Sequence, residues 1–185
     1  MSMLACGERA ASFLPIASLK EMIVKESFMA RIKKILAPTD LSELSKLGLR
    51  YGLELARDES AELIVYHAID FSADWYNGRA EYGTPKRNLL VESHRILDKF
   101  LADNFADCID LVEVRRVVEF GAPAKNIVEA AASEGVDIIV MSTHGRTGVD
   151  RFILGSIAEK VVARAPCPVL IVPRGGRAGA AAKAA

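Results

Sequence analysis

The sequence predicts an α/β protein: a five-stranded parallel sheet with helices on both faces, a Rossmann-like arrangement. Short apolar runs alternate along the chain with segments of helical periodicity. The spacing between the runs suits right-handed crossovers, which join parallel strands. At 185 residues the chain can bury one good core and is short for two typical domains, so we expect one folded domain.

The first strand is expected at residues 32–37, an apolar run that Pro38 stops. A helix should follow from Ser42, with either Asp40 or Ser42 as its N-cap. Its inward face should consist of apolar residues three and four positions apart, namely Leu44, Leu47, Tyr51 and Leu55.

The second strand is expected at residues 61–69, with His67 as a structural residue near its end. Residues 71–83 are polar and aromatic without a period, which is typical of a loop. Its aromatic residues are open to three interpretations: a lid, a partner surface, or a cover over nearby core. Those residues are Trp75, Tyr76 and Tyr82.

Thr84 and Pro85 are typical of the start of a helix. Its shared face should hold Leu90, His94, Leu97 and Leu101. A valine-rich third strand is expected at residues 111–120, followed by a helix at 122–134 that Gly135 closes. The inward residues of that helix should be Ile127, Val128, Ala131 and Ala132. The remaining elements are a strand at 137–141, a helix at 155–165 and a strand at 169–172.

The two ends of the chain are expected to lie outside the domain, which should span residues 29–173. Residues 1–28 are either an appendage before Met29 or an amphipathic helix packed on the domain surface. Residues 174–185 hold no large apolar side chain, so we expect a mobile tail.

Composition excludes several classes of function. Lys and Arg together number 24, equal to Asp and Glu, so the chain lacks the overall basic charge of a nucleic-acid binder. The three cysteines stand far apart, which indicates neither a disulfide framework nor a zinc site. No apolar run is long enough for a membrane span, and the first residues lack the pattern of a signal peptide. We therefore expect a cytoplasmic protein that binds neither nucleic acid nor membrane.

Residues 137–156 are the most informative stretch, because a buried strand there runs into a glycine-punctuated loop and a helix start. Glycines let backbone N–H groups converge on a phosphate, and a helix start carries unpaired donors. Gly145 and Gly148 could equally serve turn geometry alone. The loop is not a Walker loop, because no Gly-Lys-Ser/Thr follows the glycines.

These residues place the chain beside a known family. The segments KKILAPTDLS, VYHAID and STHGRTGVDRFILGSIAEKVVARAPCPVLIV resemble the universal stress protein family, over about residues 31–173. Gly145, nine residues and then Gly155-Ser156 match the spacing of the nucleotide-binding branch. That branch usually has a further glycine three positions before Gly145, where this chain has Ser142.

The resemblance implies a site for ATP or AMP. Asp40 would bond the ribose or the adenine region, and the backbone of Ala68 would read adenine. Mg²⁺ or Mn²⁺ would bridge phosphate oxygens, with no metal ligand from the protein. The implied nucleotide-binding residues are Pro38, Thr39, Asp40, Ala68, Met141, Ser142, Gly145, Gly155, Ser156 and Ile157.

Three functions remain open from the sequence. The first is a nucleotide-dependent regulatory protein of the stress response, without a catalytic residue, dimeric through its last strand, VLIV, and acting on an unknown protein partner. The second is slow ATP hydrolysis at the same pocket, although no general base or catalytic lysine is evident near the phosphates. The third is a nucleotide-free dimeric interaction scaffold, which Ser142 in place of glycine favours.

Overall fold

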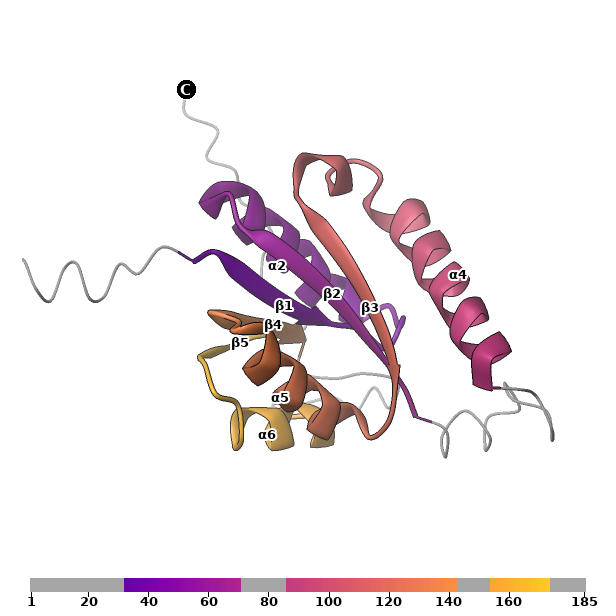
Figure 1. The fold of residues 1–185 in the computed structure, drawn as a ribbon. Coiled ribbons are helices and arrows are strands. Elements are labelled where there is room, and N and C mark those ends of the chain that lie inside the picture. The colour runs from indigo at the N-terminus through magenta and orange to yellow at the C-terminus, as the bar shows by residue number, and fades with distance from the viewer. Residues whose placement is uncertain (1–31, 71–85, 143–153, 174–185) are drawn as a thin grey trace, which may run out of the picture. The chain divides into compact units, whose positions relative to one another are not determined.

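The structure is a computed structural model, and it describes residues 32–70, 86–142 and 154–173. Within these residues the predicted parallel sheet is confirmed (Figure 1). The expectations for the extension at 1–28, the aromatic loop at 71–83, the helix start at Thr84 and the tail at 174–185 fall outside the described residues.

The sheet has five strands in the order β3-β2-β1-β4-β5. Every neighbouring pair is parallel. The strand at the end of the chain lies at one edge, as expected, and β1 lies in the centre. The strands are β1 (Lys34–Pro38), β2 (Glu62–Ile69), β3 (Val114–Phe120), β4 (Ile138–Ser142) and β5 (Val169–Val172).

Helices cover both faces of the sheet, as predicted (Figure 1). The helices are α2 (Ser45–Glu59), α4 (Lys86–Phe105), α5 (Pro123–Glu134) and α6 (Ser156–Val162). The buried side chains of α2 and α4 belong to one apolar cluster, and those of α5 and α6 belong to another. Successive residues of a strand point to opposite faces, so Ile35 and Ala37 enter the first cluster while Leu36 enters the second.

The inward face predicted for α2 is wrong. Tyr51 is 38% exposed, and Leu47 and Leu55 pack only at the margin of the core. Large apolar side chains set the predicted face, but the closest approach to the sheet is made where the helix has its smallest residues. The buried residues are Ser45, Gly48, Leu49, Gly52, Leu53 and Ala56.

The other helices follow the sequence more closely. Leu97 and Leu101 of α4 are buried as predicted, and Gly135 caps α5 in the left-handed conformation at φ 63°. Ala132, predicted to point inward, is exposed. The third strand begins at Val114 rather than at residue 111, because Ile109–Leu111 form a 3-10 turn, η1.

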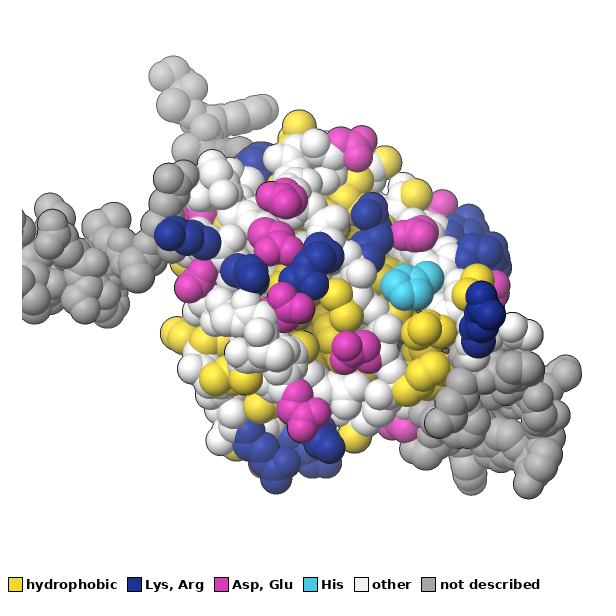
Figure 2. Space-filling model, viewed as in Figure 1, with side chains coloured by type: hydrophobic (Ala, Val, Ile, Leu, Met, Phe, Trp, Pro, Cys, Tyr) yellow, Lys and Arg dark blue, Asp and Glu magenta, His cyan; other side chains and the backbone are white. Residues whose placement is uncertain are grey.

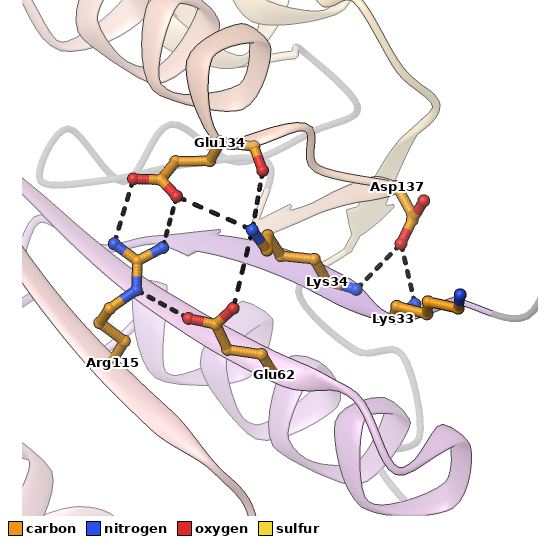
Figure 3. A network of polar contacts seen from close by, with 6 residues as sticks. All are labelled: Lys33, Lys34, Glu62, Arg115, Glu134 and Asp137. Atoms are coloured by element: carbon orange, nitrogen blue, oxygen red, sulfur yellow. Dashed lines mark hydrogen bonds and ion pairs between the residues drawn. The ribbon is translucent and has the colours of Figure 1, made fainter.

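An ion-pair network closes the amino edge of the sheet (Figure 3). The guanidinium of Arg115 on β3 donates to both carboxylate oxygens of Glu134 on α5, at 3.1 and 2.6 Å, and to Glu62 on β2 at 2.7 Å. Lys34 on β1 lies 3.9 Å from both carboxylates. The Arg115 hydrogen bonds hold the pKa of the Glu134 carboxyl below its usual value. Three strands and a helix are thereby tied together at one end.

The surface of the described residues mixes charges of both signs. On the face shown in Figure 2, basic and acidic side chains lie intermixed, with apolar side chains between them. Among the described helices, none combines the length and apolar character that a membrane span requires.

Gly48 and Gly52 give a test of the α2 packing. A Cβ at position 48 would lie 2.8 Å from the backbone nitrogen of Ser142, whereas one at position 52 would meet side chains at 3.3 Å or more. We expect Gly48→Ala to lower the free energy of unfolding by about 1–2 kcal/mol, because overpacking exceeds the gain in helix propensity. Gly52→Ala should be neutral or slightly stabilising in the same urea titration. Equal stability of the two variants would contradict the close packing at position 48.

Candidate functional site

The neighbouring strands β1 and β4 have their carboxyl ends at the switch point of the sheet, where the strand order reverses. The chain runs from β1 outward through β2 and β3, and then returns to the other side of β1 to form β4 and β5. In open α/β sheets, ligands bind outside the carboxyl ends of the strands at this point. Pro38 ends β1 and Ser142 ends β4, so the topology brings these two predicted residues to one place.

The two strands part before they end. Their ladder consists of the pairs Ile35 with Ile138 and Leu36 with Ile139. The backbone of Lys34 faces β4, because its carbonyl accepts from Asp137 N–H at 2.9 Å. By strand alternation the backbone of Pro38 also faces β4. Proline has no N–H to donate, so the ladder cannot continue there and the strand ends are left apart.

A buried hydroxyl network shapes the loop after β1. Ser45 Oγ donates to the carbonyl of Ser42 at 2.8 Å, so Thr39 Oγ1 is the donor in the 2.9 Å bond that joins the two hydroxyls. Thr39 Oγ1 in turn accepts from the N–H of Leu41 at 3.0 Å. Thr39 is 6% exposed, and its side chain therefore acts on the conformation of the loop.

Leu41 adopts a left-handed backbone with φ 63°. This region costs a branched residue about 1–2 kcal/mol, and it persists only where surrounding contacts impose it. The Thr39 hydroxyl supplies one such contact, and packing of the Leu41 side chain against the core supplies another. Strained residues of this kind cluster at ligand sites, which marks the loop as a candidate.

Asp40 sits within the loop and is half-buried. Its Oδ1 accepts from the N–H of Ser42 at 3.1 Å, which closes a local turn. Ser42 Oγ accepts from the N–H of Ser45, the first residue of α2, at 3.2 Å. The predicted N-cap at Asp40 or Ser42 is wrong, because the N-cap is Leu44, whose side chain makes no capping bond. The carboxylate is thus held at the switch point by the turn that starts α2.

His67 ties this loop to β2. Its Nδ1 lies 2.8 Å from the carbonyl oxygen of Thr39, and the residue is 6% exposed. A carbonyl oxygen only accepts, so Nδ1 carries the hydrogen. The N–H of Thr39 donates to the carbonyl of Tyr66 at 2.8 Å. Both the N–H and the carbonyl of Thr39 are therefore hydrogen-bonded to residues of β2, next to Ala68.

The end of β4 lies against α2. Met141 is 6% exposed and belongs to the core on the α5 side, while Ser142 is half-buried at the last position of the strand. Gly48 of α2 permits this approach, because a side chain there would meet the backbone of both residues. Gly48 was not among the predicted residues, although Gly48 and Gly52, four positions apart on one helix, are a signal of close packing.

The start of α6 supplies exposed backbone donors. Gly155 is the N-cap, and no side chain caps this helix start. Ser156 is the first helical residue, and the helix is shorter than the predicted 155–165, because it ends at Val162. Ser156 is exposed and Ile157 is 39% exposed. The first N–H groups of a helix have no partner within it, so they are available to an acceptor.

The structure thus brings most of the predicted residues to the carboxyl edge of the sheet. Pro38, Thr39 and Asp40 follow the central strand, Ala68 lies near the end of its neighbour, and Met141 and Ser142 end the strand on the other side. Gly145 lies outside the described residues. Ser45 and Leu41 are additions that no motif indicated, since their roles arise from the buried hydrogen bonds and the backbone angle.

Comparison with known proteins identifies the family of this chain. The sequence profile of the universal stress protein family matches residues 31–173. The universal stress protein MJ0531 of Methanocaldococcus jannaschii is 33% identical over 147 residues, covering 77% of this chain and 82% of the relative. The universal stress protein MJ0577 of the same organism is 31% identical over 156 residues, covering 77% and 95%.

A solved structure of MJ0577 shares the fold. It superposes with a TM-score of 0.62 at 31% identity and covers 78% of this chain and 98% of the other. The fold is that of a doubly wound α/β protein, and its candidate site lies at the switch point of the sheet. The chain belongs to the universal stress protein family.

Thr39 tests the hydroxyl network. We expect Thr39→Val to lower the free energy of unfolding by about 1–2 kcal/mol, because the N–H of Leu41 loses its acceptor and Ser45 loses a donor. Thr39→Ser keeps the hydroxyl and is the matched control in the same urea titration. If the serine variant is as unstable as the valine variant, the methyl group rather than the hydroxyl holds the loop.

Proposed function

We propose that this protein binds an adenine nucleotide, ATP or AMP, at the carboxyl edge of the sheet. The observation that carries the proposal is the loop after β1, a rigid turn that presents the Asp40 carboxylate where β1 and β4 part. The bound nucleotide would then alter contacts with a protein partner, which makes the function regulatory.

The chemistry of the site suits each part of such a ligand. A carboxylate accepts hydrogen bonds from ribose hydroxyls, and Asp40 is the half-buried acidic side chain of this loop, whereas Glu43 is exposed. The backbone of Ala68 would read the edge of adenine. The N–H groups at Ser156 and Ile157 would donate to phosphate oxygens, with the glycine loop containing Gly145 adding further donors.

Other proteins of this fold have been seen with adenine nucleotides. One solved universal stress protein is in complex with cAMP, with a TM-score of 0.52 and 22% identity to this chain. Another, from Archaeoglobus fulgidus, is in complex with dAMP, with a TM-score of 0.51 and 18% identity. At these identities the likeness extends to the fold alone, so they support the proposal only by showing what this fold can hold.

A divalent ion would accompany a triphosphate through its phosphate oxygens. Within the described ranges, no cluster of three or more His, Cys, Asp or Glu side chains could hold a metal. Mg²⁺ or Mn²⁺ prefers oxygen ligands, and bridging phosphates supply them. We propose that the ion is bound through the phosphates of the ligand.

Binding without turnover is the form of the proposal that the site favours. Hydrolysis requires a group that orients or deprotonates the attacking water near the phosphates. Ser156 and Ile157, the first two residues of α6, carry no general base at neutral pH. The first turn also holds the exposed carboxylate of Glu159, so hydrolysis through Glu159 is the alternative that a phosphate-release measurement decides. A nucleotide-free scaffold is the second candidate, because Ser142 replaces the glycine that the nucleotide-binding branch usually has.

Asp40→Asn tests nucleotide binding directly. Asparagine keeps an Oδ1 acceptor for the N–H of Ser42, so the turn is preserved while the charge is lost. Hydrogen bonds to a charged group contribute about 1.5–3 kcal/mol, so the affinity for ATP with Mg²⁺ should fall roughly 10- to 100-fold in calorimetric titration.

Asp103→Asn is the control, since Asp103 is exposed near the end of α4 and pairs with Lys99 at 2.8 Å. Its affinity should equal that of the wild type. No heat and no thermal shift with the wild-type protein would contradict nucleotide binding and favour the scaffold. Phosphate release from bound ATP would favour the slow hydrolase instead.

We also infer a homodimer that pairs along β5. This strand is an edge of the sheet, and its residues Val169, Leu170 and Ile171 are only half-buried. An apolar edge strand with open backbone groups pairs readily with a second copy.

Val169→Pro tests this edge. The carbonyl of Pro168 accepts from Ile139 N–H at 3.0 Å, so by alternation the backbone of Val169 faces away from β4. Proline there would remove a donor of the open edge and spare the ladder to β4. Sedimentation should show dimers of the wild type at micromolar concentration and monomers of the variant. A monomeric wild type would contradict the dimer.

A further inference from the structure

The backbone of β2 alternates between its two neighbours in a way that fixes where Ala68 points. The N–H of Glu62 donates to the carbonyl of Lys33, the residue before β1, at 2.9 Å, and the carbonyl of Tyr66 accepts from the N–H of Thr39 at 2.8 Å. The backbone N–H and carbonyl groups of the even-numbered β2 residues therefore point toward β1. By the same alternation the N–H and carbonyl of Ala68 face the side of β1, beyond its last residue.

The odd-numbered residues confirm the alternation. The N–H of Leu63 donates to the carbonyl of Glu113 at 2.8 Å, and the carbonyl of Ile69 accepts from Gly121 at 3.1 Å. Both partners flank β3. The backbone of His67 thus faces β3, while its imidazole reaches back to the loop after β1.

A regular parallel ladder would continue differently from the one observed. In a parallel ladder every second residue of one strand bonds, through its N–H and its carbonyl, the residues before and after its partner on the other strand. The last pair of the ladder is Pro38 with Tyr66, so the next pair would be Thr39 with His67. In that register the N–H of Thr39 bonds the carbonyl of Tyr66, as observed, and the carbonyl of Thr39 would bond the N–H of Ala68. Among the described residues, the donor to that carbonyl is instead His67 Nδ1, at 2.8 Å.

We propose that His67 is a positioning residue that opens the β1·β2 ladder one step early and so reserves the backbone N–H of Ala68 for the ligand. The imidazole takes the place of the ladder donor, and Ala68 keeps a donor directed beyond the end of β1. This inference rests on the proposed function, because the ligand group that meets Ala68 is the hydrogen-bonding edge of a nucleotide base.

The side chain at position 67 also sets the separation between two parts of the site. Ala68 follows His67 in the chain, and Asp40 follows Thr39. The 2.8 Å bond between His67 Nδ1 and the carbonyl of Thr39 therefore holds β2, with Ala68, at a fixed position relative to the loop that carries Asp40. A side chain without a donor would leave the carbonyl of Thr39 unpaired. The carbonyl would then take the N–H of Ala68, which would close the ladder and remove the donor from the site.

Hydrogen exchange at the amide of Ala68, measured without nucleotide, tests the opened ladder. In the wild type we expect this amide to exchange at least 10-fold faster than the amides inside the β1·β2 ladder. His67→Leu should slow it to their level, and His67→Asn should keep it fast, because the asparagine Nδ2–H stands where the imidazole Nδ1–H stands. A slow Ala68 amide in the wild type would overturn the proposal even if no variant folds.

Nucleotide affinity tests the consequence for the ligand. We expect His67→Leu to weaken AMP binding about 10-fold, with His67→Asn restoring it and binding of inorganic triphosphate unchanged in both. Equal loss in the asparagine and leucine variants, or equal loss for triphosphate, would overturn the positioning role. A wild type that binds no AMP would overturn the proposed function instead, and the exchange rates alone would then decide whether His67 opens the ladder.

Discussion

The site depends on one constraint: the central strand is released from both neighbours at the same place. Toward β4, Pro38 has no N–H with which to extend the ladder. Toward β2, the imidazole of His67 occupies the carbonyl of Thr39. A strand in the middle of a sheet normally has its backbone groups consumed by pairing. Here the pairing ends on both sides within two residues, and the chain turns out into the loop that holds Asp40.

The opposite edge of the sheet is built in the contrary way. Several ion pairs join β1, β2, β3 and α5 there, through Lys34, Glu62, Arg115 and Glu134. The carboxylate of Asp137 also accepts from the backbone N–H groups of Lys33 and Lys34 at the start of β1, at 2.8 and 2.9 Å. Single exposed pairs contribute little, but a network with bidentate geometry contributes more. The amino edge is thereby fixed, which leaves the carboxyl edge free to be irregular without loss of the fold.

The sequence predicted what depends on local pattern and missed what depends on register. The strands, the edge position of β5 and the cap at Gly135 follow from apolar runs and glycine, and they are confirmed. The inward face of α2 was wrong because periodicity weighs large apolar residues, whereas Gly48 decides how closely the helix lies on β4. The Thr39–Ser45 bond depends on the conformation of the loop after β1, and the His67 contact joins residues of two segments whose proximity the register of β1 and β2 defines.

This division bears on how such a site is recognised in a sequence. Most of the ligand contacts that we propose are made by main-chain groups, at Ala68 and at the start of α6, and a main-chain group leaves no side-chain signature. The side chains that matter are then those that shape the backbone: proline at 38, the hydroxyl at 39, glycine at 48 and the imidazole at 67. Asp40 is the exception, since its charge acts on the ligand itself.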